Sequence, residues 1–253
     1  MNTLRKRNQK TENYTVVNFL DLDPKKFTFS EKEKSKHDCF YNHILYEGKN
    51  LFVKYERRIC PFGVYTNMNE KGLPKFIPVK PGFSTSISCE KDYENDPYHR
   101  KAKELDEFFI KTCSRNKKIT DLSFLEKELR GCDEKGFKGF WKRLLKWSYK
   151  ADEDIGERVY LVHPPLLEFS VPSFAGKLKP AFFDSDGEKM GVITSDKVDS
   201  VLPRFTKVSV AAQWSAITHG AFGITIQPKA FHIKIHGNDR PRADKSLFES
   251  DEE

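Results

Sequence analysis

The strongest constraint on the fold is a long alternation of apolar and polar residues that runs through residues 203–235. Across residues 206–218 one side of the chain is apolar and the other is polar or small, which is the two-residue period of a half-buried strand. Residues 222–235 alternate in the same way, and Gly220 and Gly223 can form a turn or bulge between the two arms. The C-terminal part of the chain is therefore predicted to form a pair of long β-strands.

The rest of the chain combines further strand patterns with one helical block. Residues 49–59 alternate between apolar and charged side chains, which predicts a half-buried strand with a cationic outer face. Asp184-Ser-Asp-Gly187 predicts a hairpin turn. Shorter strands are predicted at 63–66, 75–88, 158–163, 166–171, 179–183 and 189–193, and helices at 97–114, 120–130 and 136–149. The expected fold is mainly β, in the α+β class, with a helical insertion at about 97–150.

The charge of the chain is unevenly distributed. Its 44 Lys and Arg residues exceed its 37 Asp and Glu residues, for a formal net charge of +7, although five of the acids lie within the last ten residues. The body is more basic than the total indicates, which favours nucleic acid or an anionic membrane surface as a partner.

Cysteine spacing and hydropathy indicate the compartment. The five cysteines never form a C-x-x-C pair, so neither a disulfide framework nor a thiolate zinc site is indicated. No run of about 18 apolar residues occurs. We expect a soluble, intracellular protein in a reducing compartment.

The two ends of the chain differ in composition from its centre. Residues 1–13 are polar and basic and are expected to form a flexible arm, whereas 14–236 are expected to form a single domain. A polar hinge begins at residue 237 and leads to an acidic tail that ends at residue 253. The tail is expected to compete for the basic surface or to recruit partner proteins. Its candidate residues are Phe248, Glu249, Asp251, Glu252 and Glu253.

Candidate binding residues are the cations and aromatic side chains on the outer faces of the predicted strands. Phe52 shares its face with Lys54 and Arg58, a combination of ring and cations that is typical of surfaces for single-stranded nucleic acid. Trp214 is a second candidate for base stacking. It shares its face with Val208, however, so packing in the core is its simpler interpretation.

The C-terminal arms add a second group of cations. Lys207, His232 and Lys234 lie on the polar face of the alternation, and Arg204 precedes it. These side chains could contact phosphates, or could form the solvated side of an edge strand.

Residues 135–150 combine an apolar stripe at helical spacing with many cations. The simplest interpretation is a helix that packs on the body and exposes a basic back. The functional alternatives are a nucleic-acid contact through Lys142, Arg143 and Lys146, and a helix that docks on a membrane surface or a capsid.

Catalytic motifs are nearly absent. The sequence contains no phosphate-binding loop, dinucleotide-binding fingerprint, nucleophile elbow or H-E-x-x-H pair. Asp38, Glu47 and Lys49 have the D…E-x-K arrangement of metal-dependent nucleases, and this is the enzymatic alternative. His232 and His236 would lie about 13 Å apart in a strand and could not share a metal ion. We expect no metal, no cofactor and no enzymatic activity.

Residues 202–235 resemble the strand, tryptophan-bearing turn and strand that close the OB-fold in single-stranded DNA-binding proteins of the T7 phage type. Related OB-fold proteins of large DNA viruses are similar, and the resemblance covers roughly residues 158–253. It implies an OB-type barrel of five or more strands, with Lys207 on the strand before the turn. It also implies an acidic tail that covers the DNA groove and recruits replication proteins. The tail of this chain departs from the family pattern because it is short and Phe248 is not terminal.

The function implied is binding of single-stranded DNA, without strong sequence preference, in replication, recombination or repair. RNA is the alternative nucleic acid. The expected partners are single-stranded DNA, replication or recombination proteins bound through the tail, and a second copy of the chain in a homo-oligomer. No membrane partner is expected. The resemblance implies the cytoplasm, at a viral replication site or in a phage-infected cell.

Overall fold

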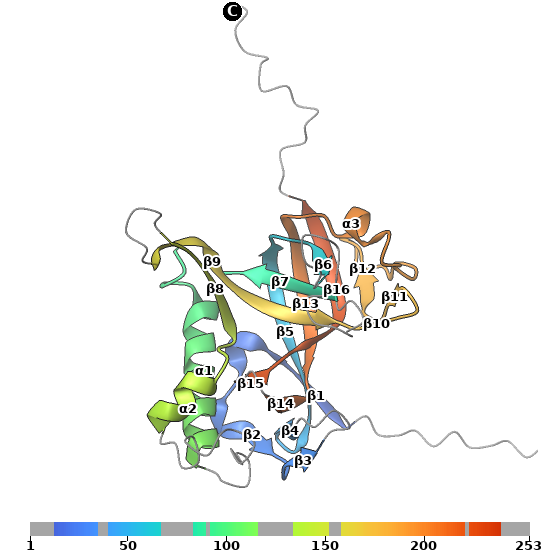
Figure 1. Cartoon of the computed structure of the whole chain (residues 1–253). Helices are drawn as coiled ribbons and strands as arrows, with labels where there is room; N and C mark the ends of the chain where they lie inside the picture. The colour runs from blue at the N-terminus through green and yellow to red at the C-terminus, as the bar shows by residue number, and fades with distance from the viewer. Residues whose placement is uncertain are drawn as a thin grey trace, which may run out of the picture.

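The computed structural model describes residues 13–34, 40–66, 83–89, 92–115, 134–151, 158–220 and 223–238. Strands dominate it, and the sheet curls into a half-barrel with α1 and α2 beside it (Figure 1). The expected mainly β, α+β class is therefore confirmed, and the curled sheet matches an OB-like fold. The basic arm up to residue 12, the predicted helix at 120–130 and the acidic tail lie outside the described residues.

The first half of the described chain contains most of the small elements. Its strands are β1 (Tyr14–Asn18), β2 (Phe27–Phe29), β3 (Glu33–Lys34), β4 (Phe40–Tyr46), β5 (Lys49–Cys60), β6 (Val64–Thr66) and β7 (Phe83–Ser88). Its helices are the 3-10 turns η1 (Phe19–Asp21) and η2 (Pro24–Lys26), then α1 (Pro97–Arg115) and α2 (Glu134–Phe140).

The second half is almost entirely β. Its strands are β8 (Leu145–Ala151), β9 (Arg158–Val171), β10 (Ser173–Phe174), β11 (Lys177–Leu178), β12 (Ala181–Phe183), β13 (Thr206–Trp214), β14 (Ala216–Gly220), β15 (Gly223–Ile226) and β16 (Lys229–Asn238). One short helix, α3 (Val198–Val201), precedes β13. The main sheet follows the order β15-β14-β4-β5-β13-β16-β9-β7-β6.

Strands β5 and β13 form the centre of the sheet and carry its core. Every second residue of β13 is buried, which confirms the alternation that the sequence predicts. Trp214 at its end is fully buried, and its indole Nε1 donates a hydrogen bond of 2.9 Å to the Tyr55 hydroxyl. Phe109 of α1 packs against the same indole, with ring centroids 6.3 Å apart. Aromatic side chains therefore fill the space between α1 and the sheet.

The two long C-terminal arms predicted from the alternation are in fact four strands. Strand β13 pairs with β16, whereas β14 pairs with β15 and β4. The first arm breaks at Ser215, whose carbonyl accepts a hydrogen bond from the Ile44 amide. The second breaks at Pro228, which has no N–H for a ladder and whose carbonyl binds Ser170. Gly220 and Gly223, which are predicted to form a turn or bulge, are the last pair between β14 and β15.

The predicted helix at 136–149 is wrong in its second half. Helix α2 ends at Phe140, and residues from Leu145 onward form β8, which pairs with β9. The helix stops because the Lys142 amide donates to the Ile224 carbonyl, at 2.8 Å, instead of to a carbonyl one turn earlier. Gly223 allows this approach, because a Cβ at its position would lie 2.6 Å from the Phe140 carbonyl oxygen.

Asp106 fastens α1 to the connection between α2 and β8. Its carboxylate accepts hydrogen bonds from Trp141 Nε1 at 2.8 Å and from the Leu144 amide at 3.1 Å. Burial raises the pKa of Asp106 to about 6, although these two hydrogen bonds act in the opposite direction. Burial also lowers the pKa of His219 to about 4, with a smaller contribution from Lys32.

We expect Asp106→Asn to change how stability depends on pH. The raised pKa of Asp106 stabilises the fold below about pH 4, and this is lost as the pH rises through about 6. The lowered pKa of His219 stabilises the fold above about pH 6.5, and this is lost as the pH falls through about 4. Each is worth about 3 kcal/mol, so the two nearly cancel. Urea unfolding from pH 4 to 7 should show stability rising with pH in Asp106→Asn. An unchanged profile, equal to that of the exposed control Glu94→Gln, would contradict this.

Candidate nucleic-acid interface

The candidate interface is the outer face of the sheet on strands β1, β5, β13, β16 and β12. These strands lie side by side, because β1 pairs with β5, β5 with β13, β13 with β16 and β16 with β12. Residues that alternate with the buried ones point away from the core on this face. They include Phe52 and Lys54 from β5 and His232 and Lys234 from β16, so the structure brings these four predicted residues together.

A groove runs along the centre of this face because β13 carries short side chains there. Ser209 and Ala211 form its floor, between the longer side chains of β5 and β16. Two hollows of about 570 and 940 Å³ follow one another along it and share Lys54, Ala211 and His232. We call this depression the cationic groove. Its described lining contains the cations Lys54, Arg57 and Lys234.

A bulge in β5 determines which arginine faces the groove. Tyr55 is paired with Val210 and Arg58 with Val208, so two residues of β5 stand opposite Ser209 alone. Arg57 adopts a positive φ of 39° within the bulge, and its amide donates to Ser209 Oγ at 3.1 Å. The extra residue reverses the alternation beyond it. Arg57 therefore lines the groove, and Arg58 turns to the opposite side.

The prediction that Arg58 binds nucleic acid is therefore wrong on structural grounds. Its guanidinium makes a bidentate contact with Asp96, at 3.0 and 3.1 Å, and lies 4.0 Å from the centroid of the Tyr98 ring. The side chain of Asp96 is completely buried, and its carboxylate also caps α1 by accepting from the Tyr98 amide at 2.7 Å. Arg58 thus holds the start of α1 on β5.

Two irregularities in β16 expose further side chains to the groove. The register with β13 shifts between Ala211 and Ala212, so that Phe231 becomes an extra residue beside His232 and is 50% exposed. A second shift near Lys207 leaves His236 between two paired residues. The sequence alternation instead predicts that Phe231 faces the core.

Aromatic rings cross the face from one edge to the other. Tyr14 of β1 contacts Phe52, with ring centroids 5.4 Å apart, and Phe52 contacts Phe231 at 5.0 Å. Phe231 contacts His232 at 4.5 Å, and His232 contacts Phe183 of β12 at 5.3 Å. We call these five rings the aromatic row. It runs across the strands, and its five rings line the two hollows of the cationic groove.

The two histidines of the groove are held in the neutral form by their surroundings. Burial lowers the pKa of His232, with Lys189 as a second cause. Burial also lowers the pKa of His236, and Arg57 and Lys234 add to the effect. Nε2 of His236 lies 2.7 Å from Ser209 Oγ. An anion in the groove would favour the protonated form of both rings.

The other predicted binding residues lie away from the groove centre. Trp214 is fully buried and cannot stack on a base, which corrects that prediction. Lys207 lies on the outer face at the end of β13, and Arg204 is exposed in the connection before it.

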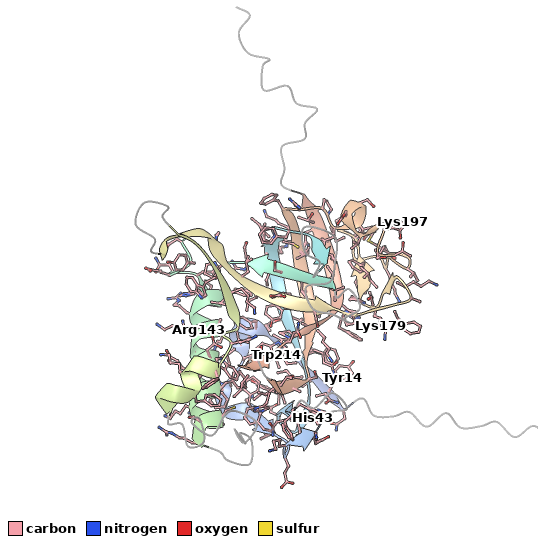
Figure 2. The ribbon with its side chains drawn as sticks, in the orientation of Figure 1. Tyr14, His43, Arg143, Lys179, Lys197 and Trp214 are labelled. Atoms are coloured by element: carbon pink, nitrogen blue, oxygen red, sulfur yellow. The ribbon has the colours of Figure 1, made fainter. Side chains whose placement is uncertain are left out.

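The predicted cations at 142–146 lie in a separate part of the molecule. Lys142 and Arg143 are exposed in the connection between α2 and β8, and Lys146 is exposed at the start of β8. Figure 2 shows Arg143 beside the helices and Tyr14 on the other side of the sheet. The structure therefore does not bring these three cations to the groove.

The alternative functions receive no support from the described residues. The carboxylate of Glu47, one of the proposed nuclease residues, pairs with Lys26 at 2.7 Å, and Asp38 lies outside the described residues. No three His, Cys, Asp or Glu residues gather as a metal site within the described ranges. The continuous basic helix at 135–150 that a membrane or capsid contact would use is absent. None of the helices in the described ranges is both long and apolar enough to span a membrane.

Sequence reasoning missed Arg57, Tyr14, Phe183 and Phe231. Arg57 and Phe231 enter the site through bulges, which the alternation of residue types does not reveal. Tyr14 and Phe183 enter because β1 and β12 pair in parallel with distant strands. Every second residue of β1, beginning with Tyr14, is exposed in the structure, and the local sequence does not reveal this.

Comparison with known proteins gives likenesses to solved structures only. No family model matches the sequence, and no curated protein matches it. The single-stranded DNA-binding protein from bacteriophage Enc34 is 13% identical with a TM-score of 0.42, over 88% of this chain and 96% of that one. Its complex with single-stranded DNA gives 12% identity and a TM-score of 0.42, over 85% and 98%. The single-stranded DNA-binding protein gp2.5 from bacteriophage T7 is 10% identical with a TM-score of 0.37, over 80% and 98%. The chain is similar in outline to proteins of the class that the sequence resemblance names.

Proposed function

We propose that the chain binds single-stranded DNA across the outer face, with the backbone in the cationic groove and bases on the aromatic row. The observation that carries this proposal is the adjacency of exposed rings and cations on one continuous sheet face. Proteins that bind single strands combine a positive groove with aromatic platforms on which successive bases stack. The proposed setting is replication, recombination or repair, and no catalytic step is proposed.

The exposed rings favour a single strand over a duplex. Tyr14 is 42% exposed and Phe231 is 50% exposed, so both can present a ring surface to a ligand. Bases in a duplex are already stacked on one another, whereas those of a single strand are free to stack on side chains.

Fluorescence anisotropy tests the proposal directly. Labelled single-stranded DNA, duplex DNA and RNA of equal length are titrated with the full chain at two salt concentrations. We expect the tightest binding to single-stranded DNA, with an affinity that falls as salt rises because bound phosphates release counterions. Preference for the duplex, or affinity that does not depend on salt, would contradict the proposal.

The aromatic row gives a prediction that separates stacking from charge. Phe52→Ala and Phe231→Ala should each weaken single-strand binding by about 1–3 kcal/mol, because each removes a stacking platform. The salt dependence should not change, since no cation is lost. Val192→Ala is a suitable control, because Val192 is 71% exposed and does not belong to the row. A variant that loses affinity together with salt dependence would argue against stacking.

The groove histidines predict that binding tightens as the pH falls. Both pKa values lie below the ordinary value of 6.5 in the free protein, so both rings are mainly neutral at pH 7. A phosphate next to them raises the pKa values, and binding then takes up protons. Anisotropy from about pH 7.5 to about 5.5 should show increasing affinity. His232→Gln with His236→Gln should make the affinity nearly independent of pH in this range. If the double substitution leaves the pH dependence unchanged, the two histidines do not contact the DNA.

A further inference from the structure

A third hollow, distinct from the two that form the groove, enters the interior of the half-barrel. Its volume is about 190 Å³, and its inner wall contains Tyr55, Phe169 and Trp214 from the core. Its rim carries the exposed cations Lys142 and Arg143. Figure 2 shows Arg143 beside the helices, on the other side of the sheet from Tyr14.

The inner end of this hollow contains a hydrogen-bond donor with no acceptor. The Tyr55 hydroxyl accepts from Trp214 Nε1, but its own proton has no acceptor among the described residues. Tyr55 is only 1% exposed, and burial raises its pKa well above 10, so the hydroxyl keeps its proton. A buried donor without a partner is unfavourable unless a ligand or water completes it.

Tyr55 lines both this hollow and the groove, and because its buried side chain points to the core side of β5, we assign the side chain to this hollow. Tyr55 belongs to β5, whereas the described rim belongs to residues 142–146, β9 and residues 225–228. Its ring lies 4.8 Å from the ring of Phe169 on β9, at the inner wall. The donor is therefore placed at the bottom of a hollow that has cations at its mouth.

The cationic rim is held in place by backbone contacts. The Lys142 amide donates to the Ile224 carbonyl, and the Leu144 amide donates to Asp106. A Cβ at Gly223 would collide with the Phe140 carbonyl, so the two segments are in close contact here. Lys146 lies 3.9 Å from Glu168, which keeps a carboxylate beside the cations. The backbone of the rim therefore loses little entropy when a ligand binds, and the ordering cost falls on the exposed side chains of Lys142 and Arg143.

The dimensions and polarity of the hollow select one kind of ligand. It is smaller than the about 300–1,000 Å³ of sites for drug-sized molecules, so it admits one ring system. Leu167, Ile226 and Pro228 give it apolar walls, and Tyr55 offers a donor to a ring carbonyl or ring nitrogen. The rim is suited to a phosphate. A planar ring with acceptors at one end and a phosphate at the other is a nucleotide.

We propose that this hollow binds a single nucleotide, with its base against the Tyr55 hydroxyl and its phosphate on Lys142 and Arg143. The nucleotide can be free or can be the end of a strand, since both offer the same base and phosphate. The two sites share no cation in their described linings, although Tyr55 lines a hollow of each.

Isothermal titration of the full chain with a deoxynucleoside 5′-monophosphate tests the proposal. We expect saturable binding that weakens by about tenfold or more in Lys142→Gln with Arg143→Gln. Lys54→Gln with Lys234→Gln removes the same charge from the groove and should leave nucleotide binding within about twofold. No saturation up to about 10 mM, or an equal loss in the groove variant, overturns the proposal.

Recognition of the base is tested by a second pair of ligands. Tyr55→Phe should weaken the nucleotide and leave ribose 5-phosphate unchanged, because only the base reaches the hydroxyl. Urea unfolding checks that Tyr55→Phe is folded. If Tyr55→Phe does not fold, the nucleotide affinity of the variant Lys142→Gln with Arg143→Gln decides whether the hollow is the binding site. Equal effects on both ligands would show that the hollow holds only a phosphate and water.

A 5′-phosphorylated trinucleotide distinguishes the two sources of the nucleotide. If the trinucleotide displaces the bound mononucleotide, the ligand can be the end of a strand. If it does not, the ligand is a free nucleotide.

The two proposed sites can fail independently. If the groove proposal is wrong, oligonucleotide binding disappears but the monophosphate still binds at Arg143. If the hollow proposal is wrong, the monophosphate does not bind there, while Lys54 and Lys234 still control oligonucleotide affinity.

Discussion

Reversing two charges in the cationic groove should abolish most single-strand binding. We expect Lys54→Glu with Lys234→Glu to weaken affinity for an oligonucleotide by about 100-fold at about 50 mM salt, since it removes two phosphate contacts and adds repulsion. The corresponding neutral variants, Lys54→Gln and Lys234→Gln, should each reduce the slope of log K against log salt by about 0.7. Anisotropy at four salt concentrations measures both effects.

The control for this experiment must change the net charge equally. Lys103 and Lys111 are exposed on α1, away from the groove. Lys103→Glu with Lys111→Glu should change affinity only slightly, because charges farther away than about 10 Å are largely screened at about 0.1 M salt. An equal loss in both pairs would mean that overall charge, and not the groove, determines binding.

The sequence alone predicts the parts of the site that depend on regular alternation. Phe52, Lys54, His232 and Lys234 were expected on outer faces and are found on one face. Their strands keep the two-residue period between bulges, and hydrophobic burial fixes which side points inward. The same reasoning places Trp214 in the core, where it is completely buried.

The sequence does not predict the parts that depend on contacts between distant segments. Arg57 and Arg58 exchange roles because the β5 bulge is completed by Ser209 and Tyr98, whose hydroxyls accept from the Arg57 and Glu56 amides. Neither partner is near in sequence, so alternation assigns Arg58 to the wrong face.

The connection at residues 141–145 shows the same limit. Its apolar residues fit helical spacing, yet those from Leu145 onward also fit a strand. Pairing with β9 and the hydrogen bond from Lys142 to Ile224 decide in favour of the strand. Such tertiary contacts override a local pattern whenever both structures bury the same side chains.

Neighbouring arginines with separate roles allow one matched comparison. Arg58→Met should lower the free energy of unfolding by about 3–5 kcal/mol, because it leaves the fully buried Asp96 carboxylate without its counter-charge. Arg57→Met should change stability by no more than about 0.5 kcal/mol, since the Arg57 side chain is exposed and the bulge is held by its backbone amide. Urea unfolding at pH 7 measures both.

Binding should respond to the same two substitutions in the opposite way. Arg57→Met should weaken single-strand affinity and reduce the salt slope by about 0.7, whereas folded Arg58→Met should bind as the parent does. Adding Asp96→Asn to Arg58→Met should restore part of the lost stability, because it removes the buried charge and keeps an oxygen to cap α1. Weaker binding by Arg58→Met at full stability would mean that Arg58 faces the ligand and that the β5 bulge does not separate the two roles. We expect Arg57→Met to affect only binding and Arg58→Met to affect only stability. This result follows only if the β5 bulge turns Arg57 to the groove and Arg58 to the opposite side of the strand.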